Sequence, residues 1–144
     1  MSHKSEAEFG RALDKGLTLL GYDIHNIQTP TTERGCPDRY LQRGTFSGWI
    51  ELKNEHCDIK VCEQVVKYRE GQQAWLHRHY KAGGIGITGI AGKDGYLFFL
   101  HQRVLVHKIY KWESEPQLFI SHLYFETLDS WLQQFKPGMS KVIW

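Results

Sequence analysis

Apolar residues recur every three or four positions near the N-terminus, a spacing typical of one face of an amphipathic helix. The segment is 5–20, "SEAEFGRALDKGLTLL", and its apolar positions are Phe9, Leu13, Leu17 and Leu20. Ser5 precedes the pattern as a candidate N-cap, and Gly21 follows it as a residue type at which helices end. We therefore predict a helix over 5–20.

Strand-like segments come next, where apolar and polar residues alternate. Strands are predicted over 22–29, 38–43 and 47–54, with a loop over 30–37. The tripeptide "GTF" between the last two strands is short enough to close a β-hairpin.

The rest of the chain returns first to a helical pattern and then to strands. A second helix is predicted from Val65 or Gly71 to Ala82. It is followed by a Gly-flanked strand over 82–92, a turn at Asp94-Gly95, a hairpin partner over 96–101, an apolar segment over 103–110 and a late helix over 128–135. The order of helix, three strands, helix and two or more strands predicts an α/β single domain, with a mixed central sheet flanked by helices.

Composition and charge narrow the function classes only a little. The chain has 144 residues, and 18 Lys and Arg against 16 Asp and Glu give a net charge of +2, which permits a nucleic-acid partner without requiring one. No apolar stretch is long enough for a membrane span, and the N-terminus lacks the apolar region of a signal peptide. Three cysteines fit a reducing compartment. We expect a cytoplasmic protein without a membrane partner, in the host-cell cytoplasm if a phage encodes it.

Candidate chemistry lies in the strand "GWIELKN". Alternation puts Trp49, Glu51 and Lys53 on one face, and Ile50 and Leu52 on the other. Asp38 lies on the preceding strand, thirteen residues before Glu51. Two adjacent carboxylates repel unless a hard cation joins them, and Mg²⁺ prefers such oxygen ligands. A lysine beside the cation could hold a water, which makes this set suited to attack on a phosphodiester. A solvated strand face explains the same residues.

Further motifs give the sequence a family resemblance. Pro37-Asp38 followed by Glu51-Leu52-Lys53 resembles the signature of the PD-(D/E)xK nuclease superfamily. The chain is most similar there to the VRR-NUC (virus-type replication-repair nuclease) family, in particular to its small stand-alone phage forms. The matching segments are "EAEF", "GCPD", "GWIELK" and "REGQQAWLHRHYKAGG". Cys36 departs from the pattern, because an aliphatic residue is more usual there.

The resemblance implies an αβββαβ core over about 5–100 and a role for each matched residue. Asp38, Glu51 and the backbone carbonyl of Leu52 would bind the metal, Mg²⁺ or Mn²⁺ in its place. Lys53 would orient or deprotonate the attacking water. Gln72 would reach toward Lys53 or the scissile phosphate, and Glu6 would act through a metal-bound water.

Several assignments stay open at this level. Glu8 competes with Glu6 for the inward position, and Gln73 competes with Gln72. Basic residues near the site could bind phosphates or form a solvated helix face; they are Lys67, Arg69, Arg78 and Lys81. Trp49 and Trp75 are read as core residues rather than as a base-stacking platform. A His77–His79 metal pair and a zinc site at His56, Cys57 and Cys62 are both disfavoured by spacing.

The resemblance also implies the function. The expected protein is a metal-dependent DNA endonuclease, a single nuclease domain over 1–144, with branched or Holliday-junction-like DNA as its substrate. We expect a homodimer, with the apolar extension over 101–144 contributing to the dimer surface. A general nicking or DNA-degrading nuclease is the alternative role, and a catalytically silent nucleic-acid-binding module is the alternative class.

Overall fold

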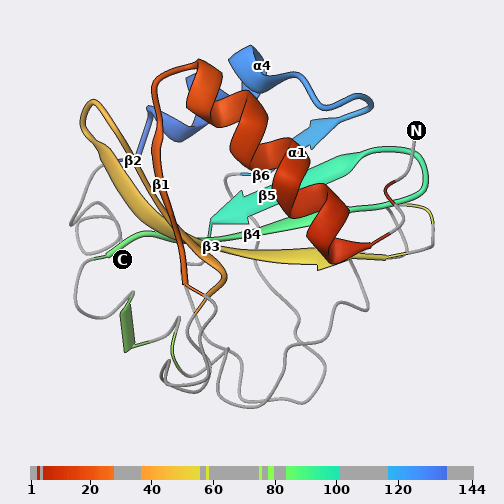
Figure 1. Cartoon of the computed structure of the whole chain (residues 1–144), viewed down its shortest axis with the longest axis horizontal. Coiled ribbons are helices and arrows are strands. Elements are labelled where there is room, and N and C mark those ends of the chain that lie inside the picture. Colours follow the sequence, from red (N-terminus) through yellow and green to blue (C-terminus); the bar gives the residue numbers. More distant parts are fainter. Residues whose placement is uncertain are drawn as a thin grey trace.

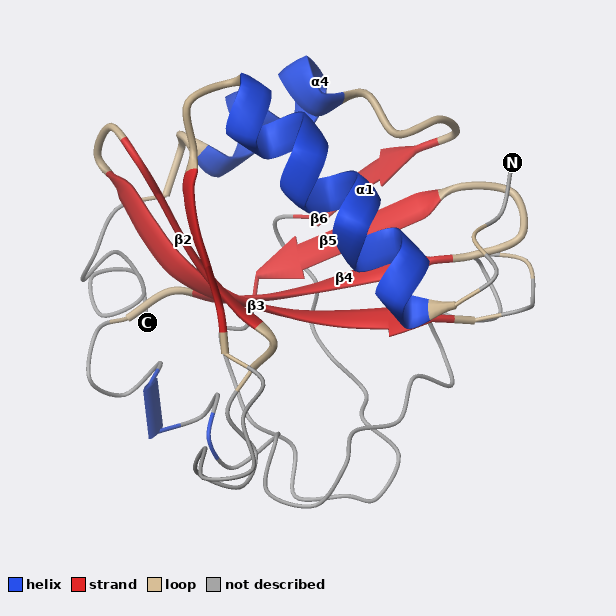
Figure 2. Cartoon of the chain, in the orientation of Figure 1, coloured by secondary structure: helices blue, strands red, loops and turns tan. Residues whose placement is uncertain are grey.

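In the part of the chain that the structure describes, six strands form one mixed sheet, and helices α1 and α4 cover the same face of it (Figures 1 and 2). The computed structural model describes residues 3, 5–27, 37–55, 58, 75, 78–79, 84–100 and 117–135. Their elements are α1 (Glu6–Leu19), β1 (Asp23–Asn26), β2 (Arg39–Arg43), β3 (Phe46–Asn54), β4 (Gly86–Ala91), β5 (Tyr96–Leu100), β6 (Gln117–Ile120) and α4 (Phe125–Leu132). The strands lie in sequence order, and only β3 and β4 run parallel to each other.

Helix α1 forms where the apolar spacing predicts it. The Ser5 hydroxyl accepts a hydrogen bond from the Glu8 amide at 3.1 Å, so Ser5 is the N-cap. Phe9, Leu13 and Leu17 are fully buried against the sheet. Gly21 then adopts a positive φ of 96°, which the lack of a Cβ allows, and turns the chain into β1.

The predicted hairpin between β2 and β3 is present. Arg43 pairs with Phe46, which leaves a two-residue loop of Gly44 and Thr45. Gly44 has a φ of 60°, the positive value that the first loop residue of a type II′ turn requires. The tight turn fixes the register of the two strands that carry the candidate site residues.

The parallel pairing of β3 with β4 requires a crossover between them. Trp75, Arg78 and His79 are helical within this crossover, and the rest of the helix predicted up to Ala82 lies outside the described residues. The Trp49 ring lies 4.9 Å from the Trp75 ring and 6.0 Å from the His79 ring, measured between centroids. Trp75 and His79 therefore pack on the face of β3 opposite to the one that α1 covers.

The elements after residue 95 agree only in part with the sequence-based prediction. The predicted strand over 96–101 and late helix are present as β5 and α4, but α4 begins at Phe125 and not at 128. The edge strand β6 was not located from sequence, because its four residues are too few to show an alternation. The apolar segment over 103–110 lies outside the described residues.

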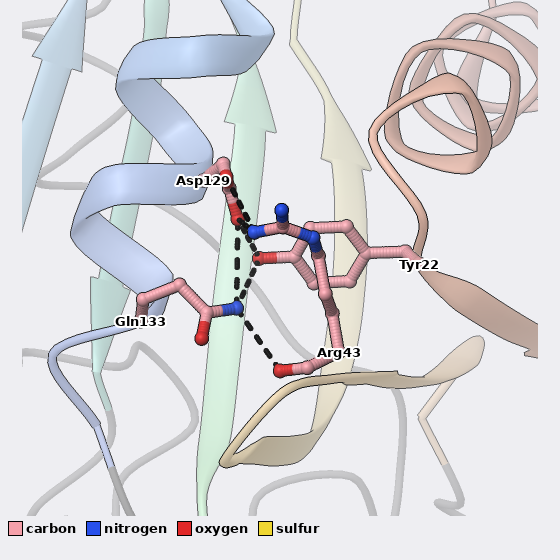
Figure 3. Close-up of polar contacts among 4 residues, drawn as sticks. All are labelled: Tyr22, Arg43, Asp129 and Gln133. Carbon is pink, nitrogen blue, oxygen red and sulfur yellow. Dashed lines mark hydrogen bonds and ion pairs between the residues drawn. The ribbon is translucent and has the colours of Figure 1, made fainter.

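A polar cluster joins α4 to the β2–β3 hairpin (Figure 3). Both Asp129 carboxylate oxygens accept hydrogen bonds from Arg43 Nη1, at 2.9 and 2.8 Å, and Oδ1 accepts a third from the Tyr22 hydroxyl at 2.7 Å. Gln133 Nε2 donates to the Arg43 carbonyl oxygen at 3.0 Å and to the Tyr22 hydroxyl oxygen at 3.2 Å. The cluster fastens the C-terminal end of β2 to α4.

Burial, and then the hydrogen bond to Asp129, raise the pKa of Tyr22 well above its ordinary value. Because the folded-state pKa lies above the unfolded one, the stabilisation is complete below pH ~10 and is lost as the pH rises further. Tyr22→Phe should cost about 1–3 kcal/mol at pH 8 and flatten the decline of the unfolding free energy above pH 10. Denaturant melts at both pH values measure this. The exposed Tyr124, changed to Phe, is the control, and an undiminished decline in Tyr22→Phe contradicts the expectation.

Candidate active site

Asp38 and Glu51 lie on neighbouring chain segments where β2 begins. The last rung between β2 and β3 pairs Arg39 with Ile50, and β3 continues four residues further to Asn54. One more step along the same register places Asp38 opposite Glu51. The two carboxylates predicted to bind a metal therefore come from neighbouring chain segments at the point where the pairing ends.

The backbone of Leu52 faces the same gap. Its amide donates a hydrogen bond to Asp38 Oδ2 at 2.9 Å. The Trp49 amide donates instead to the carbonyl of Ile85, just before β4, and the Glu55 amide to that of Ala91, the last residue of β4. Odd-numbered residues of β3 therefore direct their backbone groups to the β4 side. A strand residue directs its amide and its carbonyl to the same side. The Leu52 carbonyl thus points toward the side of Asp38, as a third oxygen for a cation would.

Lys53 adds a positive charge to this cluster. Its ammonium lies 3.4 Å from Glu51 Oε2, and alternation along β3 sets both side chains on the face of Trp49. Asp38, Glu51 and Lys53 are only 2%, 1% and 7% exposed. Carboxylate oxygens gathered in such a buried place are groups that a hard cation can bind.

The two glutamates of the first turn of α1 face different surroundings. Glu6 lines an open hollow of about 250 Å³ together with Ala7, Arg11, Asn26 and Arg39. Glu8 lies 3.4 Å from His3 Nδ1 instead. Of the two candidates, Glu6 is therefore the one that lies near Arg39, the first residue of β2 and the residue that follows Asp38.

The remaining predicted residues fall into two groups. Gln72, Gln73, Arg69 and Lys81 lie outside the described residues. Arg78 is exposed on the crossover. Trp49 and Trp75 are half-buried and contact each other, and the His79 ring stacks on Trp75 at 4.9 Å between centroids. Burial lowers the pKa of His79 and favours its neutral form.

Sequence reasoning missed Arg39, which is buried directly beside Asp38. Its guanidinium forms an ion pair with Asp14 of α1 at 2.7 Å. One signal was available: the strand pattern sets Arg39 on the core face, with Leu41, where a charge needs a partner.

The donor set fits a hard divalent cation. Two buried carboxylates and a carbonyl facing one gap are the oxygen ligands that Mg²⁺ accepts, with waters completing its shell. Within the described ranges, no three His, Cys, Asp or Glu side chains group closely enough to hold a metal, so Glu6 does not join Asp38 and Glu51 as a direct ligand set. No helix in the described part of the chain is long and apolar enough to cross a membrane.

Comparison with known proteins identifies the fold. No family model and no curated protein matches the chain. The crystal structure of Hjc from Archaeoglobus fulgidus, a Holliday junction resolvase from an archaeal hyperthermophile, superposes with a TM-score of 0.50 at 17% identity. The match covers 65% of this chain and 74% of Hjc. The predicted α/β fold is confirmed. It is a mixed sheet flanked by helices, and it is similar to the fold of Hjc.

Proposed function

We propose that the chain is a metal-dependent DNA endonuclease that hydrolyses phosphodiester bonds. The observation that carries the proposal is the buried cluster of Asp38, Glu51 and Lys53 at the end of the β2–β3 pairing, with the Leu52 backbone turned toward it. A solvated strand face, the alternative reading of these residues, does not account for the burial of all three side chains.

Each residue of the cluster has a distinct task. Asp38, Glu51 and the Leu52 carbonyl would hold Mg²⁺ or Mn²⁺. The bound cation would supply charge neutralisation at the scissile phosphate and lower the pKa of water. The Lys53 ammonium, held beside Glu51, would orient the attacking water and steady negative charge on the phosphate oxygens. Glu6 and Gln72 are proposed as auxiliary residues at the edges of the site.

The proposed substrate is branched DNA. The fold neighbour is described as a Holliday junction resolvase, which supports this choice over linear duplex. A four-way junction has twofold symmetry, so two symmetric cuts would require two copies of a chain with one site each. We therefore propose a homodimer. Membership of the VRR-NUC family and a phage role in replication, recombination or repair stay predictions.

A cleavage panel tests the proposal. End-labelled linear duplex, single strand, flap and four-way junction are incubated with the protein in Mg²⁺, Mn²⁺ or EDTA. We expect cleavage that requires metal and is fastest on the junction. Equal cutting of all substrates would favour the general nicking nuclease. Binding to DNA without cleavage in either metal would favour the silent binding module and contradict the proposal.

A further inference from the structure

Arg39, the neighbour of Asp38 in the chain, is buried and forms an ion pair with the partly exposed Asp14 of α1. Its Nε and Nη2 donate to the two Asp14 carboxylate oxygens at 2.7 and 3.2 Å, and its side chain is 7% exposed. The guanidinium lies across Gly10, where a Cβ would come within 2.5 Å of Nη2. A larger residue at position 10 would therefore force the guanidinium to move.

The start of β2 is a place that needs such an attachment. Arg39 forms the last rung of β2 with β1, through Asn26, and with β3, through Ile50. One backbone hydrogen bond lies beyond it, from the Ile27 amide to the Asp38 carbonyl at 3.0 Å. Terminal rungs open more readily than central ones. Beyond this rung, Asp38 and Glu51 stand opposite each other, and like charges in opposed strand positions repel. A side-chain attachment at this terminal rung therefore helps to hold Asp38 in its place opposite Glu51.

We propose that Arg39 is a positioning residue for the metal site: its ion pair with Asp14 fastens the start of β2 to α1 and keeps Asp38 opposite Glu51. The inference rests on the proposed function of this site. Because the Arg39 charge is balanced by Asp14, its effect on Asp38 is mechanical and reaches the metal only through the position of that carboxylate.

The same strand provides a matched control. Arg43 lies four residues along β2, on the same face, and pairs with Asp129 of α4 at 2.8 Å. Both ion pairs fasten β2 to a covering helix, but the Arg43 pair lies at the opposite end of the strand from Asp38. A purely structural role predicts the same consequences for loss of either arginine.

The experiment is calorimetric titration of Mn²⁺ into the full chain and into Arg39→Met and Arg43→Met, at a temperature where all three are folded. We expect Mn²⁺ affinity to fall about 10- to 100-fold in Arg39→Met, the usual cost of losing a residue that orients a ligand, and to stay within about twofold of wild type in Arg43→Met. Arg39→Lys keeps the charge without the forked geometry and should recover part of the loss. Raising Mn²⁺ should restore cleavage by Arg39→Met toward the wild-type rate.

A second variant keeps the test decisive if Arg39→Met does not fold. Gly10→Ala favours the helix intrinsically but drives a methyl group against the guanidinium, so it should also weaken Mn²⁺ binding. Equal Mn²⁺ affinity in the Arg39, Gly10 and Arg43 variants overturns the inference. Wild-type protein that neither binds Mn²⁺ nor cleaves DNA overturns the proposed function instead.

Discussion

Lys53→Ala is expected to slow DNA cleavage about a hundredfold or more while leaving Mn²⁺ affinity unchanged or slightly higher. The ammonium lies 3.4 Å from Glu51 Oε2, so it competes with a cation for that carboxylate. Its removal takes away a repulsive charge from the metal and, at the same time, the group proposed to hold the attacking water.

Three measurements on one protein preparation test this expectation. Mn²⁺ titration reports the metal, gel shift on four-way junctions reports DNA binding, and single-turnover cleavage reports the chemistry. DNA binding should persist, because distributed phosphate contacts supply most of that affinity. Lys93→Ala, an exposed lysine in the β4–β5 turn, is the control. Cleavage by Lys53→Ala at the wild-type rate means that the lysine has no part in the mechanism.

Asp38→Asn should have the opposite profile, with metal binding and cleavage lost together. The amide oxygen of Asn can still accept the hydrogen bond from the Leu52 amide, so the local backbone should keep its place. One negative charge next to a divalent ion is removed, and we expect Mn²⁺ affinity to fall by more than about a hundredfold, or about 3 kcal/mol.

A second expectation for Asp38→Asn concerns its melting temperature in the absence of metal. Because Asp38 and Glu51 repel each other, the variant should melt at the same temperature as wild type or higher in EDTA. Mn²⁺ at about a hundredfold above its wild-type Kd should then stabilise wild type by about 2.7 kcal/mol and the variant by less than about 0.4 kcal/mol. A variant that is destabilised in EDTA and still stabilised by Mn²⁺ contradicts the assignment of Asp38.

The sequence predicted what depends on local periodicity. The spacing of Phe9, Leu13 and Leu17 gave α1, and the alternation of "GWIELKN" gave the two faces of β3. The short loop gave the hairpin, and the hairpin register in turn sets Asp38 opposite Glu51. These features need only residues close together in the chain.

The features that were missed depend on contacts between distant segments. Asp14 and Arg39 lie 25 residues apart, and no local sequence pattern around either residue predicts that they pair. The sequence spacing of Glu6 and Glu8 did not show which of them faces the site. Glu6 lies at the hollow beside Arg39 and Glu8 lies beside the His3 imidazole, and both neighbours come from outside that helical turn. Strand β6 was missed for a related reason. Its formation depends on pairing with β5, which the pattern of its own four residues does not indicate.

The proposed metal site at Asp38 and Glu51 is tested most directly by locating the bound metal. Crystals of the protein soaked in Mn²⁺ and measured at a wavelength where manganese scatters anomalously would give the ion's position without reference to activity. We predict one anomalous peak between Asp38 and Glu51, about 2.1 Å from their carboxylate oxygens and from the Leu52 carbonyl oxygen. A peak elsewhere on the molecule, with the gap between those two carboxylates filled by solvent alone, would contradict it.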